Sequence, residues 1–239
     1  MDHAMLFKSF LISLPYIVMI FFAVSGIHLM LYIKMPKYYM FIIKLFSKWS
    51  DNTWRLSVIY TFSQNINFFK EFEIVLRNLY GSYKKRVNLV NKKAYDFGIF
   101  SLIIQSDFDF SVSQSMKVEM HFSMINVTYK NSIERLEELQ RLFHKLEEHL
   151  SIEDKTYDLK IQFSRNFHNP FYGVAIQHLG EEHIQDFECS FSADVFNIRH
   201  GQNTIDDESV IRVFKDCIDV NNSEFDIVKL CTKKCLLLE

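Results

Sequence analysis

The chain has 239 residues, of which 49% are hydrophobic, and its 27 Lys and Arg against 29 Asp and Glu give a formal net charge of −2. Four cysteines in a chain of this length, with no C-x-x-C pair among them, exclude a disulfide-dense scaffold. We therefore expect Cys189, Cys217, Cys231 and Cys235 to be reduced thiols in a hydrophobic core.

The first feature along the chain is an apolar run over residues 9–33, in which His28 is the one residue able to carry charge. At about 1.5 Å per helical residue, this run reaches across a hydrocarbon layer of about 30 Å. A secretory signal peptide ending near Ser25 is the alternative, but the apolar residues continue past that point through Ile33. Residues 1–34 are therefore predicted to form a single transmembrane anchor.

The charges that flank this run predict its orientation. Lys8 precedes the run, whereas Lys34, Lys37, Lys44, Lys48 and Arg55 follow it closely. The side of a membrane span that is richer in Lys and Arg normally stays in the cytoplasm. We therefore expect a single-pass protein of the inner (plasma) membrane with a cytoplasmic C-terminal domain.

Residues 35–53 are predicted to be an interfacial amphipathic segment. In a helix, Lys37, Lys44 and Lys48 would lie along one side, and Trp49 favours the headgroup zone of a bilayer. The alternative is a continuation of the same helix that packs against neighbouring copies of the chain.

Three residues of the apolar run predict self-association. A neutral imidazole at His28 is accommodated by a hydrogen bond to a neighbouring helix, and Ser25 and Gly26 offer a small surface for close helix approach. We therefore expect a homo-oligomer. The alternative is a lone anchor in which a neutral His28 is shielded near the inner end.

Residues 54–239 are predicted to form one compact α+β domain, because no Pro-rich, Gly-rich or Ser-rich linker divides them. Residue periodicity predicts strands over 55–62, 97–105, 107–113, 117–125, 157–163, 172–179 and 187–191, and helices over 65–80, 131–150 and from about 206. Residues 225–238 fit either element. We expect a mixed or antiparallel sheet with about three covering helices and a weak internal repeat of about 60 residues.

Charge is distributed unevenly, with a net of +3 over residues 1–54, +5 over 55–105 and −10 over 106–239. The basic residues concentrate in a predicted loop that is flanked by tyrosines. The favoured interpretation is a solvated or lipid-facing loop, because clustered lysines beside a membrane already have an electrostatic role. The alternative is a site that binds phosphates and stacks bases, with a nucleotide or oligonucleotide as its ligand. The predicted ligand-binding residues are Tyr83, Lys84, Lys85, Arg86, Lys92 and Lys93.

The sequence offers no catalytic motif, so we expect a protein that is not an enzyme and has no metal or cofactor. The segment from His178 to His183 contains metal-ligating residue types without H-E-x-x-H spacing, and His168 lacks an evident acidic partner. The glycine patterns of the phosphate-binding loop, the dinucleotide-binding turn and the nucleophile elbow do not occur.

These features together predict a membrane-anchored receptor or effector whose cytosolic domain binds a ligand or a protein partner. Binding would change the self-association of the membrane helices. This arrangement is similar in outline to small bacterial defence effectors, which join a membrane helix to a sensing domain and permeabilise the membrane. The alternatives are a structural scaffold subunit of a membrane-associated assembly and a membrane-tethered enzyme. The expected partners are membrane lipids, further copies of the chain and the ligand.

Overall fold

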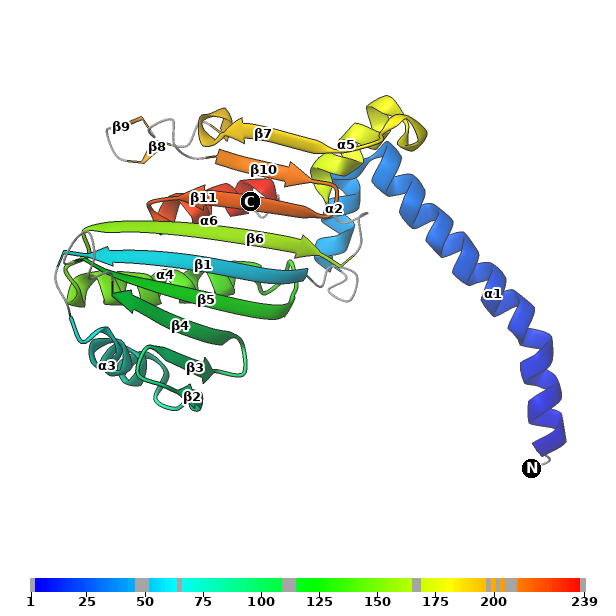
Figure 1. The fold of residues 1–239 in the computed structure, drawn as a ribbon. Coiled ribbons are helices and arrows are strands. Elements are labelled where there is room, and N and C mark those ends of the chain that lie inside the picture. The colour runs from blue at the N-terminus through cyan, green and yellow to red at the C-terminus, as the bar shows by residue number, and fades with distance from the viewer. Residues whose placement is uncertain are drawn as a thin grey trace.

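The structure is a computed structural model, and it describes residues 3–45, 52–63, 66–108, 115–164, 169–196, 199–200, 203–204 and 210–236. A nine-stranded antiparallel sheet dominates the fold, with the strand order β2-β3-β4-β5-β1-β6-β11-β10-β7 (Figure 1). Its strands are β1 (Asn52–Phe62), β2 (Lys84–Asn88), β3 (Lys92–Asp96), β4 (Ser101–Phe108), β5 (Met116–Val127), β6 (Asp154–Phe163), β7 (Glu188–Ser192), β10 (Val210–Phe214) and β11 (Cys217–Asn222). A separate two-stranded ribbon joins β8 (Arg199–His200) to β9 (Asn203–Thr204).

Three helices cover one face of this sheet: α3 (Phe68–Tyr80), α4 (Ser132–His149) and α6 (Phe225–Cys235) (Figure 1). The covered face carries one alternate set of strand side chains, which are buried against the helices. In β1 this set is Trp54, Leu56, Val58, Tyr60 and Phe62. Among the described residues, the opposite face has no covering helix, and we call it the open face.

The sheet contains two halves with related element order. The first half runs β1, α3, β2 to β5 and α4, and the second runs β6, α5 (Pro170–Leu179), β7, β10, β11 and α6. Strands β1 and β6 pair at the centre, and each half extends outward from them. Because β6 begins at Asp154 and β1 at Asn52, the repeat is 102 residues long. The predicted repeat of about 60 residues is wrong, because it equated β1 with β5 instead of β6.

Two further helices, α1 (His3–Lys34) and α2 (Pro36–Leu45), precede the sheet. Helix α1 projects away from the rest of the fold, and its C-terminal end lies beside α2 and α5 (Figure 1). Of the residues that the structure describes, no helix combines the length and the apolar character that crossing a membrane requires. The predicted transmembrane anchor over residues 1–34 is therefore wrong, as is the predicted single-pass placement in the plasma membrane.

Contacts within the protein bury the C-terminal end of α1. Tyr32 is fully buried, and its hydroxyl donates a hydrogen bond to the main-chain carbonyl of Asn169 at 2.8 Å. Tyr39 of α2 is also buried, with its ring centroid 5.0 Å from that of Tyr32. The final turns of α1 thus pack against protein. The side chains of Lys37 and Lys44, and all of Lys48 and Trp49, lie outside what the structure describes.

Several predicted elements differ from the structure. Residues 172–179 were expected as a strand but belong to α5, and the ambiguous C-terminal segment is α6. The basic segment after α3 is a β-hairpin of β2 and β3 and not a loop. The helix expected from about residue 206 begins outside the described residues, and residues 210–214 form β10.

Candidate functional site

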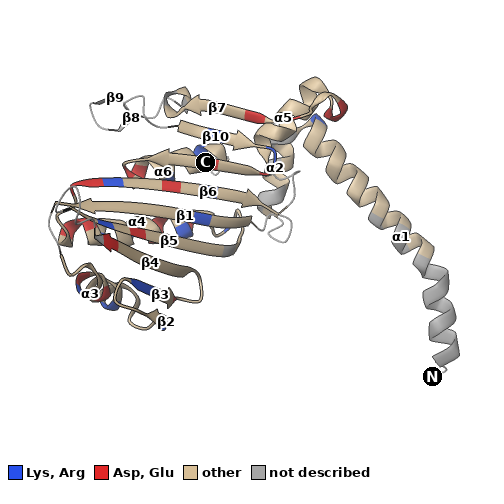
Figure 2. Ribbon diagram, in the orientation of Figure 1, with Lys and Arg blue, Asp and Glu red and all other residues tan. Residues whose placement is uncertain are grey.

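The β2–β3 hairpin places two of the predicted ligand-binding lysines on the covered face, next to α3. Lys85 and Lys93 each donate a hydrogen bond from Nζ to the same oxygen of Glu73, Oε1, at 2.7 and 2.8 Å. The hydroxyl of Tyr95 donates to that oxygen as well, at 3.0 Å. Figure 2 shows the basic residues of the hairpin in blue near α3, which carries acidic residues in red.

This cluster, Glu73 with Lys85, Lys93 and Tyr95, carries more positive than negative charge. Burial by itself would raise the pKa of Glu73, but the hydrogen bonds from Lys85, Lys93 and Tyr95 lower it to about 2. Glu73 is therefore ionised at neutral pH, and its single negative charge faces two ammonium groups. The cluster keeps a net charge of about +1 beside the N-terminal half of α3.

The other predicted ligand-binding residues do not join this cluster. Arg86 forms an ion pair with Asp96. Tyr83 packs its ring against those of Tyr95 and Phe97, with centroids 5.5 and 5.8 Å away. Within the described chain, Lys84 and Lys92 form no ion pair, and strand register places both on the open face. The six residues thus lie on two faces of one hairpin, and their role in binding stays a prediction.

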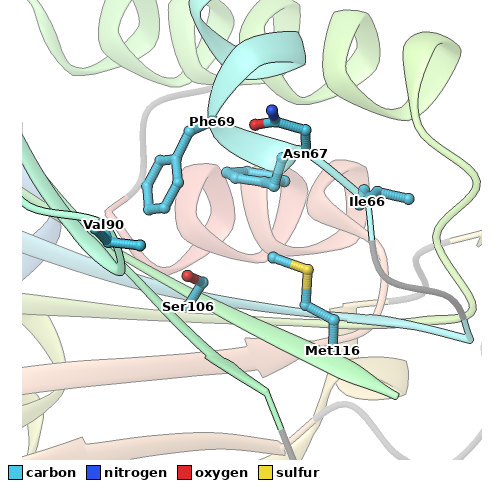
Figure 3. Close-up of a pocket in the computed structure, with 7 residues that line it drawn as sticks. Ile66, Asn67, Phe69, Val90, Ser106 and Met116 are labelled. Atoms are coloured by element: carbon cyan, nitrogen blue, oxygen red, sulfur yellow. The ribbon is translucent and has the colours of Figure 1, made fainter. Parts of the chain in front are cut away.

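A pocket of about 440 Å³ lies next to this cluster, at the N-terminus of α3. Phe68 and Phe69 come from α3, Ser106 from β4 and Met116 from β5 (Figure 3). The mouth includes Val90, in the turn between β2 and β3, which is 96% exposed. Ile66 and Asn67 complete the lining. Most of its lining residues are apolar, but several of them expose little surface to it, since Phe68 is fully buried and Phe69 and Met116 are only 8% and 7% exposed.

Two observations connect the pocket to charge. The Nζ atom of Lys93 lies 4.6 Å from the ring centroid of Phe69, so the cluster adjoins one residue of the pocket without lining the pocket itself. Asn67 caps α3, since its Oδ1 accepts a hydrogen bond from the main-chain nitrogen of Lys70 at 3.3 Å. The pocket therefore lies at the positive end of a helix dipole as well as beside an excess ammonium group.

A second region of interest is the junction that holds the end of α1 to the rest of the fold. Asn169 is fully buried and contributes three kinds of hydrogen bond. Its carbonyl accepts from Tyr32 at 2.8 Å, its Nδ2 donates to the carbonyl of Phe214 at 2.5 Å, and its Oδ1 accepts from the main-chain nitrogens of Phe171 and Tyr172. The side chain and the main-chain carbonyl of Asn169 thus link α1, the start of α5 and the end of β10.

Close packing reinforces the hydrogen bonds of this junction. A Cβ atom added to Gly173 would lie 2.7 Å from Cε2 of Tyr32, so the absence of a side chain there lets the tyrosine ring approach α5. Gln177 of the same helix donates from Nε2 to the carbonyl of Lys34 at 3.3 Å. Residues Asn169, Gly173 and Gln177 therefore contact α1 from successive turns of α5.

The predicted self-association residues of α1 lie at and beyond this junction. Ser25 and Gly26 are exposed, and no heavy atom lies within 4 Å of a Cβ built on Gly26. His28 is half-buried, with its ring 4.7 Å from that of Tyr39 in an edge-on arrangement. The structure therefore brings His28 into contact with α2, and its predicted contact with a neighbouring copy stays untested.

The residue types considered for catalysis do not converge. Among the described residues, no group of three or more His, Cys, Asp and Glu side chains is arranged to hold a metal ion. His178 is exposed, and His183 lies 3.6 Å from a carboxylate oxygen of Glu182, the residue next to it. Cys231 and Cys235 are fully buried in α6, and burial raises the pKa of the Cys231 thiol to about 12. His168 lies outside the described residues.

Sequence reasoning missed both the pocket and the junction. The residues that line the pocket come from α3, the β2–β3 turn, β4 and β5, and each has an ordinary role in its own segment. The junction did leave a signal, because Asn169-Pro170 is a capping residue followed by a favoured first residue of a helix. That signal correctly predicts a helix start where a strand was expected.

Comparison with known protein families finds no matching family model, and comparison with curated proteins finds no matching relative. The predicted part in antiviral defence therefore has no support from a family or a relative and is withdrawn, together with the membrane placement on which it depended.

Proposed function

We propose that this protein is a non-enzymatic receptor whose α+β domain binds a ligand or protein partner and whose α1 associates with α1 of other copies. The observation that carries this proposal is the combination found in α1. Its C-terminal end is fixed to the domain by buried contacts, whereas the large apolar side chains that precede this end are exposed.

The exposed part of α1 has apolar residues on every side. Met19, Ile20 and Phe22 are 63%, 64% and 69% exposed, and these three side chains point in different directions around a helix. Between Pro15 and Ile33 the helix contains no Lys, Arg, Asp or Glu, and Figure 2 shows the described part of α1 uncharged up to Lys34. A helix that is apolar all round needs apolar surroundings, because exposed patches of this kind mark interaction sites.

Other copies of α1 fit these requirements. Residues Tyr16, Ile20, Ala23, Ile27 and Met30 follow each other at alternating spacings of four and three. All five are exposed. This spacing places them along one line of the helix, as in the seam of a coiled coil, where each helix inserts side chains between those of its neighbour. Gly26 lies beside the seam and allows close approach.

The junction couples the association of α1 helices to the α+β domain. Because Asn169 and Gly173 hold α1 against α5, a change in how the α1 helices pack is transmitted as a displacement of α5 and of the end of β10. The reverse also holds, since coupling between two binding events is reciprocal. A partner that binds the domain would then change the association of α1.

The test is the mass of the full chain in solution, measured by sedimentation velocity over a range of concentrations. We expect oligomers that dissociate when Ile20 and Ile27 are both replaced by Glu. Phe22→Glu is the matched control, because Phe22 is exposed but lies away from the seam. A monomeric full chain would refute the proposal, as would equal dissociation by seam and control variants. Partition of the chain into phosphatidylcholine vesicles without any association between copies would refute it too.

A further inference from the structure

We propose that β7, the strand at one edge of the sheet, pairs antiparallel with β7 of a second copy of the chain, so that two nine-stranded sheets become one continuous sheet. The pairing is centred on Ser190, which lies on the twofold axis between the copies. This inference goes beyond the proposed function, because it names a contact between copies that does not involve α1.

The sheet has two edges, formed by β2 and β7 (Figure 1). Among the described residues, β7 pairs only with β10, so the main-chain groups on its other side have no strand partner. A strand in this position is a template for a further strand unless the protein protects it. Each edge is therefore expected to carry either protection or a partner.

Strand β2 carries the usual protection of an edge. Lys84, Lys85 and Arg86 follow one another, and the register with β3 is irregular between Lys85 and Val87. Positive charges and bulges at an edge oppose pairing with another chain. Strand β7 has neither feature, since its five residues include one charged residue, Glu188, and its register with β10 runs without a break. The protein therefore protects one edge of its sheet and leaves the other able to pair.

Strand direction selects the same edge of a second copy as the partner. Every neighbouring pair in the sheet is antiparallel, and nine is an odd number, so β2 and β7 run in the same direction. If β2 of one copy joined β7 of another with matching faces, the new pair would be parallel. An antiparallel continuation with matching faces instead joins like edges. Since positive charge opposes the pairing of β2 with β2, the pairing of β7 with β7 remains.

The side chains of β7 are self-complementary in the register centred on Ser190. Glu188 then lies opposite Ser192 of the other copy, and no charged residue of β7 lies opposite a like charge. Cys189 lies opposite Phe191 of the other copy. A shift by one residue would bring opposite faces together, and any larger shift would leave part of the strand unpaired. The register centred on Ser190 is therefore the one that pairs all five residues.

The apolar layer on the covered face stops abruptly at β7. In register with β10, Cys189 lies beside Val213 and Phe191 beside Ile211, and both residues of β10 are fully buried. Cys189 is nevertheless exposed and Phe191 is only half-buried, at the point where the sheet ends. In the joined sheet, each Cys189 would be covered by a Phe191 ring of the other copy, a cross-strand contact of the kind that stabilises sheets. The apolar layer would then continue from one copy to the next.

The first test is sedimentation velocity of the full chain carrying Ile20→Glu and Ile27→Glu, in which association through the α1 seam is removed. A strand of five residues buries less area than a standard protein interface. We therefore expect a weak equilibrium of monomer and dimer, with a dissociation constant on the order of 10 to 100 µM. A chain that stays monomeric well above this range would overturn the inference.

Cys189 supplies a second measurement. It is exposed, whereas Cys217, Cys231 and Cys235 are buried. In the proposed register, the two copies of Cys189 lie on the same face as diagonal neighbours, about 7–8 Å apart. A short bismaleimide should therefore link two copies of the chain, and Cys189→Ser should prevent the link. A dimer that sediments as such but is not linked would place the contact elsewhere and overturn the inference.

Two lysine substitutions on the open face of β7 test the register. Ser190→Lys places two like charges opposite each other at the twofold axis and should weaken the dimer about fivefold. Ser192→Lys places each lysine opposite Glu188 of the other copy and should strengthen the dimer about threefold. Each variant is the control for the other, because both add the same side chain to the same face of one strand, and near-ultraviolet circular dichroism checks their folding. Equal effects of the two substitutions would overturn the inference.

The outcome is separable from that of the proposed function. Pairing of β7 is measured in the presence of Ile20→Glu and Ile27→Glu, whereas association through α1 is measured with the seam intact. Ser190→Lys should leave association through α1 unchanged. A chain that associates only through α1 would refute the pairing of β7 and leave the proposed function standing, and a chain whose dimer is insensitive to the seam variants would do the reverse.

Discussion

Helices α3 and α5 occupy corresponding places in the two halves of the fold, since each follows the central strand of its half, yet they pack in different ways. Helix α3 lies on the covered face of the sheet, where Phe68 and Phe72 enter the core. Helix α5 instead receives α1 and α2, and it contacts the sheet mainly where β7 begins and β10 ends (Figure 1). The helix after the central strand therefore borders a pocket in the first half, where it is α3, and holds α1 in the second half, where it is α5.

Sequence differences account for this divergence. Helix α3 is amphipathic: its buried phenylalanines face the sheet, and exposed charged residues such as Lys70 and Arg77 lie on the opposite side, in solvent. Helix α5 contains no Lys, Arg, Asp or Glu, and Gly173 leaves space on its surface. A helix with apolar residues on more than one side can be covered by two partners, the sheet and α1.

The largest expected effect concerns the caps at the starts of these two helices. Asn169→Ala removes the cap of α5 and leaves the partly buried carbonyl of Phe214 without the hydrogen bond that Asn169 donates. We expect a loss of about 3 kcal/mol in the free energy of unfolding, measured by urea denaturation of the full chain. The corresponding change in α3, Asn67→Ala, removes an exposed cap and should cost about 1 kcal/mol. Equal losses would show that Asn169 is only a cap.

The second prediction tests the close contact between α5 and Tyr32 of α1, which has no counterpart in α3. Gly173→Ala places a Cβ atom 2.7 Å from the ring of Tyr32, which must move or push α1 away. We expect a loss of about 2 kcal/mol in stability. In a Tyr32→Leu background, the same substitution should cost much less, since the ring that meets the new atom is gone. A double-mutant cycle measures this difference, and strict additivity would contradict the proposed contact.

Strands and helices with one buried side were predictable from the sequence. Helices that pack against more than one other element, such as α5, were not. The strand alternation of β1 and β5 and the apolar side of α4 are visible in the sequence because each element has one buried side. Helix α5 was predicted as a strand because its short apolar run has no clear period. The apolar run of α1 is visible in the sequence, and it was interpreted as a membrane span. The sequence does not show that Tyr32 packs against the start of α5, because the two residues that make this contact are 137 positions apart.

The candidate site was predictable only in part, for a similar reason. The basic residues after α3 stand out by composition, and their alternation on a hairpin decides which of them meet Glu73. The neutralising carboxylate comes from α3, 12 residues before Lys85 and 20 before Lys93, and no local pattern connects them. Sequence therefore showed that the region is basic but not how much of its charge is left over beside the pocket.

The third prediction concerns the ion cluster, which α3 has and α5 lacks. Glu73→Gln should lower stability by about 1.5 kcal/mol at pH 7, after allowance for solvent screening. The pKa of Glu73 is about 2 in the folded protein, below its ordinary value of 4.5, so its contribution is complete above pH 4.5. The contribution is lost as the pH falls from 4.5 toward 2, because the carboxylate is then protonated in both states. Unfolding free energies of wild type and variant should therefore converge over this interval.

The smallest expected effect compares the ends of the two helices. Helix α3 ends at Gly81 with φ of 65°, and α5 ends at Gly180 with φ of 83°. Both values lie in the region that side chains disfavour, so replacement of either glycine by Ala should cost about 1 kcal/mol. At Gly180 the new Cβ also meets Oε1 of Glu182 at 2.8 Å, but that carboxylate is exposed and can move aside. Thermal unfolding of the two variants should thus show similar shifts. A much larger loss for Gly180→Ala would mean that the turn after α5 is held as rigidly as the junction itself, and that the attachment of α1 extends past Gln177 to the end of the helix.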